Sequence, residues 1–196
     1  DIYAVGIRHT GKTKAAQNVT MESAAAVKVS GVVDVSSSDQ KVEEIPQPEI
    51  AIARVEGGDV VDADVPVPWA HILRGGVQVN ASGRRFSDET RNYAQRALEV
   101  LAQRGGYVWS VYDGPIDAEL QGFAPYREVL SKGVVLSADS EDELCRVTGL
   151  PPALKETLRE VAASAITQKP DSFGRTFARA LAPPFKAVKV TGVLYH

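Results

Sequence analysis

The chain contains 196 residues, of which 44% are hydrophobic and 24% are charged, and its formal net charge is −3. This composition is typical of a globular protein, and the 22 lysines and arginines form no basic stripe, so we expect no nucleic-acid partner. No apolar run reaches the length of a membrane span, so no membrane-spanning segment is expected either. A single cysteine, Cys145, excludes an internal disulfide, and three widely separated histidines predict no metal site.

The two ends of the chain predict that it is a piece of a longer protein. The sequence begins at Asp1 without an initiator methionine and stops within the apolar run 193–196. Its beginning lacks the basic and then apolar pattern of a signal peptide, which favours a cytoplasmic location; a periplasmic location of the parent protein stays open. We expect one compact domain, composed of an N-terminal segment of unassigned role, residues 1–68, and a second region, residues 69–196.

Residues 6–13 match a phosphate-binding pattern. The letters G-I-R-H-T-G-K-T satisfy G-x-x-x-x-G-K-[ST], in which backbone amides and a lysine bind phosphate. A working loop of this kind follows a buried strand, but only the short piece 2–5 precedes it, and no parallel sheet is predicted after it. A turn before a helix at 12–29 is therefore the favoured interpretation, and nucleotide binding through Gly6–Thr13 is kept as a weaker alternative. Short strands are expected after it, at 32–33, 50–55 and 60–61.

The run from Arg74 to Glu89 combines a strand pattern with an unusual number of charges. Val77 and Val79 alternate with polar residues, residues 80–83 are turn formers, and an extended segment is expected to resume at 85–86. This pattern predicts a β-hairpin. The hairpin itself does not need the four charged residues at its end, which are Arg84, Arg85, Asp88 and Glu89. Two interpretations compete for them: a solvated surface of mutually paired charges, or a recognition site.

Beyond this run, helices alternate with short strands. Apolar residues at helical spacing and capping residues predict four helices, at 92–103, 125–131, 140–149 and 151–166. Strands are expected at 107–112, 134–136 and 187–191, and Asp113-Gly114-Pro115 is expected to form a turn. The predicted fold class is therefore α+β, with a small mixed or antiparallel sheet, a hairpin and packed helices.

Seven positions of the charged run match the pattern V-N-x-x-G-x-R-F-x-[ND]-E, namely Val79, Asn80, Gly83, Arg85, Phe86, Asp88 and Glu89. The run resembles a segment of the flavoprotein family that contains fumarate reductases, succinate dehydrogenase-like proteins, tricarballylate dehydrogenases and ketosteroid dehydrogenases. The order of elements over 69–196 is similar to the capping, substrate-side domain of this family, and the resemblance is poor before residue 69. It implies FAD as cofactor, bound mainly by a separate domain of the same polypeptide, because no G-x-G-x-x-G turn occurs in this chain.

The resemblance also implies catalytic residues. Arg74 matches an arginine of the family's proton-delivery chain, and His71 takes the place of the glutamate that precedes this arginine. The family's catalytic arginine follows the acidic pair by a few residues, which lies near Asn92 or Tyr93 here; Arg91 replaces it if the loop is shorter. An arginine suits this role because its planar guanidinium binds a carboxylate through two hydrogen bonds and stays charged when it is desolvated.

Three further residues are implied in ligand binding. Tyr93 is expected to contact substrate, and Tyr195 and His196 match the paired position of the family's H-H-T-x-G-G motif, so that His196 also faces the flavin. The resemblance thus implies the capping domain of an FAD-dependent oxidoreductase that reduces or dehydrogenates a C–C bond of a small carboxylate or enone. Such a domain is inactive without its flavin domain. A non-catalytic binding module with the same fold is the alternative.

Overall fold

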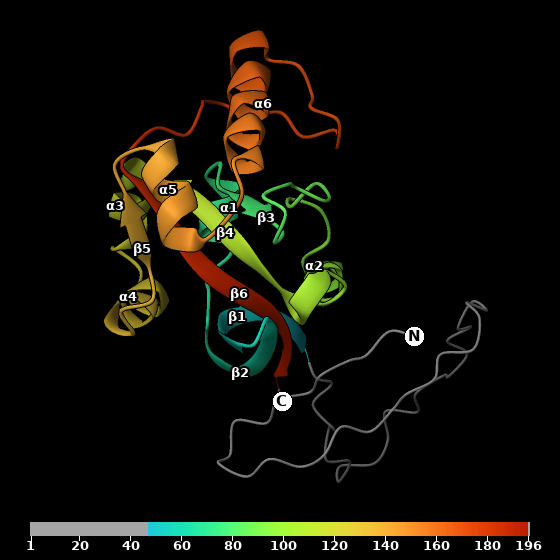
Figure 1. The fold of residues 1–196 in the computed structure, drawn as a ribbon, viewed down its shortest axis with the longest axis vertical. Coiled ribbons are helices and arrows are strands. Elements are labelled where there is room, and N and C mark those ends of the chain that lie inside the picture. The colour runs from blue at the N-terminus through green and yellow to red at the C-terminus, as the bar shows by residue number, and fades with distance from the viewer. Residues whose placement is uncertain (1–46, 196) are drawn as a thin grey trace, which may run out of the picture.

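The computed structural model of the protein describes residues 47–195, with the backbone alone at positions 47, 93, 94, 194 and 195. The described residues form one six-stranded sheet and six α-helices, arranged as Figure 1 shows. In chain order the elements are β1 Gln47–Glu56, β2 Asp59–Pro66, α1 Ala70–Leu73, β3 Val77–Val79, α2 Tyr93–Leu101, β4 Tyr107–Asp113, α3 Gly114–Leu120, α4 Ala124–Ser131, β5 Leu136–Ala138, α5 Glu141–Thr148, α6 Ala153–Thr167 and β6 Phe185–Tyr195.

The long strand β6 lies in the middle of the sheet, and all its partners are antiparallel to it. One edge pairs with β4 over residues 185–191, and the other pairs with β5 over 185–187 and with β1 over 190–195. The strand β2 extends the sheet beyond β1, and β3 extends it beyond β4. The expected α+β fold with an antiparallel sheet is confirmed. Its strands come from both sides of position 68.

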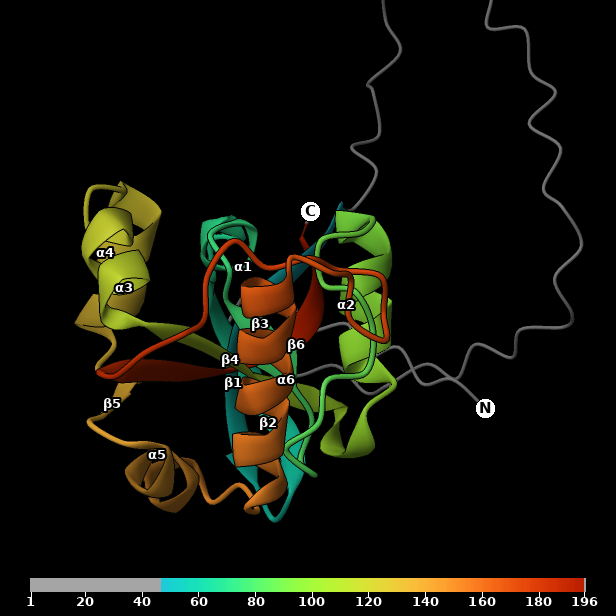
Figure 2. The same cartoon turned by 90° about the horizontal axis from the view of Figure 1, so that it is seen from above.

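The side chains of the strands alternate between two apolar layers, as the period of two requires. One layer packs against α2, α3 and α4 and includes Ile50, Ile52, Val108, Tyr112, Val188 and Val190. The other packs against α5 and α6 and includes Val77, Val79, Trp109, Val111, Phe185 and Ala187. Figure 2 shows α3 and α4 on the opposite side of β4 and β6 from α5. The sheet is therefore covered by helices on both faces.

The hairpin predicted over residues 77–86 is wrong. The turn is present, since the N–H of Gly83 donates to the carbonyl of Asn80 at 2.9 Å, but residues 85–86 form no strand. Instead β3 pairs with β4, with Val77 opposite Val111. The physical reason is that Arg85 turns into the interior and binds carboxylates there, as described below, which draws the chain away from β3.

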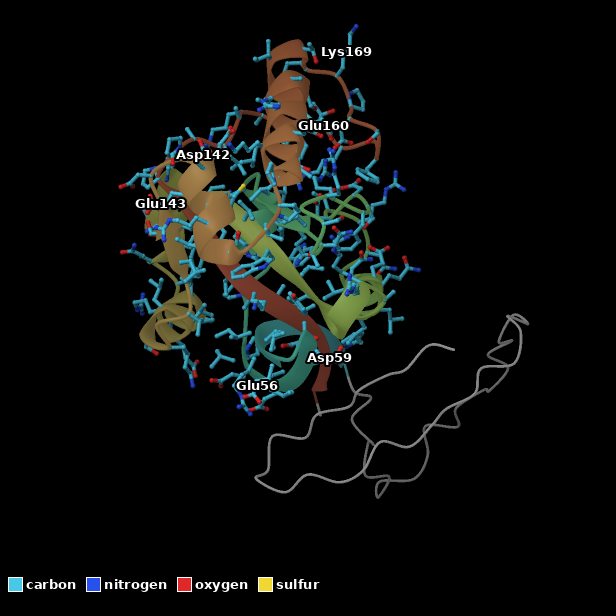
Figure 3. All side chains as sticks on the ribbon, viewed as in Figure 1. Glu56, Asp59, Asp142, Glu143, Glu160 and Lys169 are labelled. Atoms are coloured by element: carbon cyan, nitrogen blue, oxygen red, sulfur yellow. The ribbon has the colours of Figure 1, made fainter. Side chains whose placement is uncertain are left out.

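The hairpin of this sheet is β1–β2. Its two strands are joined at Gly57 and Gly58, whose φ angles of 62° and 96° lie in the region that favours glycine. Exposed acidic residues flank the turn, Glu56 before it and Asp59 after it, and Figure 3 shows them at its tip. The tip lies against the 3-10 turn Arg104–Gly106, where a Cβ on Gly105 would come within 2.2 Å of the Gly58 carbonyl oxygen.

The four helices predicted over residues 92–166 are confirmed with small shifts of their ends, whereas the helix expected at 12–29 and the strand expected at 32–33 lie outside the described residues. Ser140 caps α5, because its Oγ accepts a hydrogen bond from the N–H of Glu143 at 3.1 Å. The strand β5 begins two residues later than predicted. The turn predicted at 113–115 is wrong: the Asp113 side chain accepts from the N–H of Ile116 and caps α3, and Pro115 lies in the first turn of that helix.

The helix α2 approaches the sheet most closely at Gly192 of β6. A Cβ atom at this position would lie 2.3 Å from the Ala97 carbonyl oxygen, which is far inside van der Waals contact. Only glycine therefore allows α2 to pack at this height on the strand. Among residues 47–195, no helix is long and apolar enough to cross a membrane, and no group of three acidic, histidine or cysteine side chains could hold a metal ion.

Candidate functional site

The carboxylate of Glu89 is 0% exposed, and every hydrogen bond it accepts comes from the interior. Its oxygens accept from Arg85 Nε and Nη2 at 2.7 Å each, from Arg175 Nη1 at 2.8 Å and from the N–H of Gln78 at 3.1 Å. Burial raises the pKa of the Glu89 carboxyl, but the hydrogen bonds and charges of the two arginines outweigh burial and leave the pKa below its ordinary value. Glu89 is thus an ionised group inside the protein.

A second carboxylate completes what we call the Glu89 cluster, made of Arg85, Glu89, Asp171 and Arg175. Asp171 binds Nη1 of Arg85, and both side chains are buried. The aromatic ring of Phe177 lies 5.0 Å from the Arg85 guanidinium carbon and 4.3 Å from that of Arg175. The interpretation of Arg85 and Glu89 as a solvated surface pair is therefore wrong, because the interior supplies their partners.

The neighbouring Arg84 behaves in the opposite way. Its guanidinium binds Glu156 and lies 3.7 Å from Glu160, both on the outer side of α6, where Figure 3 shows Glu160. All three side chains are more than 40% exposed. Arg84 is thus a solvated ion-pair residue, and the two adjacent arginines of the motif have unrelated roles.

Arg175 received no role in the sequence analysis, yet it connects three segments of the chain. Its Nη1 donates to the Gly76 carbonyl at 2.9 Å as well as to Glu89, and its Nη2 donates to the Ile72 carbonyl at 2.8 Å. It thereby satisfies backbone groups at the end of α1 and at the beginning of β3. Its partners lie about a hundred positions away in the sequence, so no local pattern could reveal them.

Arg91 is the most exposed of the predicted catalytic residues, with 74% of its side chain accessible. Its Nε lies 3.3 Å from a carboxylate oxygen of Asp88. Its guanidinium lies over the loop that carries Arg175, because a Cβ atom at Gly174 would be 3.3 Å from Arg91 Nη2. Arg91 therefore presents a cationic group to solvent directly beside the Glu89 cluster.

Arg74 follows α1 and is half exposed. It forms an ion pair of 2.7 Å with Glu119 of α3, whose side chain is also about half exposed. Exposed pairs of this kind contribute little to stability, so the guanidinium is free to exchange its partner for a ligand. Arg74 and Arg91 share no partner, and the structure ties Arg74 to α3 but Arg91 to the loop at Gly174.

His71 lies in α1 and is 1% exposed. Its Nδ1 donates to the Pro68 carbonyl at 2.7 Å, which fixes the tautomer in which Nε2 is an acceptor. Nε2 is buried and has no hydrogen-bond partner. Burial lowers the pKa of His71 to about 4, so the ring is neutral at neutral pH. In this conformation His71 contacts protein rather than solvent, and a direct role toward a ligand stays a prediction.

A buried polar chain lies beside His71. The ring of Tyr112 is 5.4 Å from the His71 ring, and the Tyr112 hydroxyl shares a hydrogen bond of 2.7 Å with that of Tyr126. The Tyr126 hydroxyl in turn donates to Asp117, whose other oxygen accepts from Gln121 at 2.9 Å. Burial raises the pKa of both tyrosines, so that both stay protonated. The polar atoms of this chain are paired, in contrast to Nε2 of His71.

The other predicted residues are placed only in part. Tyr93 is the first residue of α2, a few positions from Arg91, and Tyr195 is the last residue of β6, where its backbone pairs with Gln47. The roles of both side chains stay predictions. His196 and the phosphate-binding pattern Gly6–Thr13 lie outside the described residues. The structure thus places Arg91 beside the Glu89 cluster and Arg74 directly after α1, the helix that contains His71.

No protein-family model matches the chain. Curated proteins do match it: the chain is 28% identical over 127 residues to a probable fumarate reductase, Ifc3, of Shewanella frigidimarina (strain NCIMB 400), covering 62% of the chain and 21% of that protein. It is 30% identical over 131 residues to the NADH:fumarate oxidoreductase of Klebsiella pneumoniae (strain 342), covering 63% of the chain and 14% of that protein.

Solved flavoprotein structures share the fold. An open conformation of a flavocytochrome c3 fumarate reductase superimposes with a TM-score of 0.66 at 21% identity, covering 77% of this chain and 26% of that one. The chain is similar to a domain of the FAD-dependent family of fumarate reductases, and it shares the fold of a domain in ketosteroid dehydrogenases. A 3-ketosteroid-Δ4-(5α)-dehydrogenase of Rhodococcus jostii RHA1 and a 3-ketosteroid Δ1-dehydrogenase of Sterolibacterium denitrificans match with TM-scores of 0.52 and 0.53, at 16% and 18% identity. They cover 76% of this chain each, and 29% and 32% of their own chains.

The chain spans only 21% and 14% of the two curated relatives. The described residues do not by themselves fit FAD, because a dinucleotide fold requires parallel strands with a glycine-rich turn leading into a helix. The sheet over residues 47–195 is antiparallel throughout. The chain thus resembles one domain of flavoprotein oxidoreductases such as fumarate reductases and 3-ketosteroid dehydrogenases, and its residues 47–195 contain no dinucleotide fold.

Proposed function

We propose that this domain caps and binds the substrate in an FAD-dependent oxidoreductase that reduces or dehydrogenates a C–C bond of a small carboxylate or an enone. The flavin is bound mainly by another domain of the same polypeptide. The observation that carries the proposal is Arg91, a largely exposed guanidinium on a domain whose residues 47–195 contain no dinucleotide fold. An exposed cation on the surface of this domain can contact a ligand that binds between this domain and a second one, where ligand sites are common.

Arginine chemistry supports the proposed ligand class. A guanidinium binds a carboxylate through two charge-assisted hydrogen bonds and also donates to a carbonyl oxygen, so both a small carboxylate and an enone fit Arg91. The carboxylate of Asp88 pairs with Arg91 and is itself an exchangeable partner. Arg74 offers a second half-exposed guanidinium, paired with Glu119. Binding the negative or polar end of a ligand is the step we assign to these residues.

The proposal is tested on the polypeptide encoded by the complete reading frame. The purified protein is expected to show the visible absorbance of bound flavin and to turn over either fumarate or 4-androstene-3,17-dione with a flavin-linked electron donor or acceptor. Arg91→Gln should lower kcat/KM by about 100-fold, because a donor to developing charge is lost. Arg104→Gln is the matched control, since Arg104 is an exposed arginine at the other end of α2.

Each result separates the alternatives. A complete polypeptide without flavin would support the non-catalytic binding module and overturn the proposed reaction. Flavin content together with equal losses in Arg91→Gln and Arg104→Gln would keep the oxidoreductase but remove Arg91 from its site. Stabilisation of the protein by ATP, measured as a higher melting temperature, would favour nucleotide binding through Gly6–Thr13.

A further inference from the structure

The connection between α6 and β6, residues 168–184, contains neither helix nor strand. Connections longer than about 12–15 residues without regular structure are uncommon in compact domains and are mostly either functional or disordered. This connection is anchored by two arginines that it carries, Arg175 and Arg179. Their partners lie in different parts of the domain, so the two anchors can be compared.

The anchor at Arg179 fastens the connection to the start of α3. Both terminal nitrogens of Arg179 donate to the buried carboxylate of Asp113, one of them at 2.8 Å. The N–H of Ala182 donates to the same carboxylate at 3.2 Å. Asp113 also caps α3, so this anchor serves the packing of the connection against a helix end. None of these hydrogen bonds involves Arg91.

The anchor at Arg175 fastens the connection beside Arg91. Arg175 binds Glu89, and Asp171 on the same loop binds Arg85, so two buried ion pairs join the loop to the motif. Asp171 also accepts from the N–H groups of Phe173 and Arg175, at 2.9 Å each, and thereby sets the shape of the loop. The position of Gly174 under the Arg91 guanidinium follows from these contacts.

Two ion pairs whose carboxylates are adjacent in sequence link the interior to Arg91. Asp88 is the ion-pair partner of Arg91, and the next residue along the chain is Glu89, the partner of Arg175. Asp88 is held in turn by the N–H and the hydroxyl of Thr90, at 3.0 and 2.7 Å. The backbone before Arg91 and the loop beneath it are therefore both fixed by Glu89 and its arginines.

We infer that the Glu89 cluster is a positioning device, which holds Arg91 and the loop 171–177 as one rigid wall of the ligand site. Glu89, Arg85, Asp171 and Arg175 are positioning residues in this assignment, and Arg91 is the residue that they position. The inference rests on the proposed function, since it concerns the same site. The same contacts argue against a lid in this part of the connection. Opening the loop would remove Arg175 from Glu89 and leave this buried carboxylate with one guanidinium partner fewer, which is strongly unfavourable.

The test is a double-mutant cycle of Arg91→Gln and Arg175→Lys in the complete polypeptide. Lysine keeps the charge at 175 but cannot bind Glu89, Gly76 and Ile72 together as the guanidinium fork does. Affinities for fumarate and for 4-androstene-3,17-dione are measured by calorimetry, well below the melting temperature of each variant. Asp171→Asn is a milder second variant, in case Arg175→Lys fails to fold. Arg179→Lys is the matched control at the other anchor.

We expect Arg91→Gln and Arg175→Lys each to weaken binding by about tenfold, and Arg175→Lys to have less than about a twofold effect once Arg91 is already glutamine. Arg179→Lys should leave affinity within about twofold of the unsubstituted protein. Independent effects of the two substitutions, or an equal loss in Arg179→Lys, would overturn the inference and leave the proposed function intact. Binding of neither probe by the unsubstituted protein would overturn the proposed function and the inference with it.

Discussion

Two buried polar regions of this domain, the Glu89 cluster and the surroundings of His71, differ in whether their buried groups are charged. The Glu89 cluster keeps its charges and pairs each carboxylate with arginines, so that the pKa of Glu89 lies below its ordinary value despite burial. The buried ring of His71 is instead kept neutral, because burial lowers the pKa of His71 to about 4. The difference teaches that what decides the state of a buried group is whether an opposite charge is within hydrogen-bond distance.

The largest expected effect comes from removing the charge of Glu89. Glu89→Gln keeps the shape of the side chain but leaves the guanidinium groups of Arg85 and Arg175 without their central anion. We expect a loss of about 3–5 kcal/mol in the free energy of unfolding, measured by urea denaturation. Glu119→Gln, at the half-exposed pair with Arg74, is the control and should change stability by less than about 1 kcal/mol. Equal losses in both would show that the cluster does not behave as a buried charged group.

The His71 region predicts a specific sensitivity to acid. The unfolded state binds a proton near the ordinary pKa of 6.5, whereas the folded state binds it only near 4. Stability is therefore complete above pH 6.5 and falls as the pH is lowered toward 4, by about 2 kcal/mol between pH 6.5 and 4.5. The Glu89 carboxyl adds little to the loss in this window. Its lowered pKa makes stability fall with acid as well, but mainly below its ordinary pKa of 4.5.

The variant that tests this assignment is His71→Asn, whose amide can still donate to the Pro68 carbonyl as Nδ1 does. Urea denaturation at pH 6.5 and at pH 4.5 should show the unsubstituted protein losing stability and the variant losing much less. The same slope in both proteins would place the acid sensitivity elsewhere.

A smaller effect is expected in the tyrosine pair next to His71. Tyr126→Phe removes the hydroxyl that donates to Asp117 and is bonded to Tyr112, and leaves two buried polar groups with one partner fewer. We expect a loss of about 1–2 kcal/mol in urea denaturation. Tyr107→Phe serves as the control, since the Tyr107 side chain is only partly buried and makes a cation–π contact through its ring. A loss of the same size in the control would remove the hydroxyl chain as the cause.

The smallest effect separates the two adjacent arginines of the motif. Arg84→Ala removes an exposed ion pair with Glu156 on α6 and should cost about 0.5 kcal/mol or less, with the difference vanishing at high salt. Arg85→Ala removes a buried guanidinium and should be far more destabilising. Comparable losses in the two variants would contradict the division between solvated and interior charges.

The local part of this fold was predictable from the sequence. Helix ends follow from capping side chains such as Ser140, and the strand β4 follows from a run of aromatic and β-branched residues. The turn at 80–83 was predicted correctly, but the hairpin prediction was wrong. The direction of the chain after the turn is set by the ion pair of Arg85 with Asp171, and these two residues lie far apart in sequence. The turn predicted at Asp113 was wrong for a different reason: residues that favour turns also favour the first positions of helices, and here they begin α3.

The candidate site was predictable only as a list of residue types. The matched pattern contains Arg85 and Glu89, but their spacing in the sequence is also typical of paired surface charges. Their burial depends on Arg175, whose contacts with Ile72 and Gly76 span most of the described chain. Long-range pairing of this kind leaves no periodic signal in a single sequence, so the distinction between a positioning residue and a ligand-binding one had to come from the structure.

The position of β6 has a consequence for how the domain is made. This strand joins β1, β4 and β5, yet the ribosome synthesises it after all of them. Until it emerges, β1 and β4 have no shared neighbour, and the edges that β6 will cover remain open to pairing with other chains. Translation pauses or truncations shortly before residue 185 should therefore yield a species that needs chaperone protection, and folding is expected to be slow because its decisive contacts join distant parts of the chain.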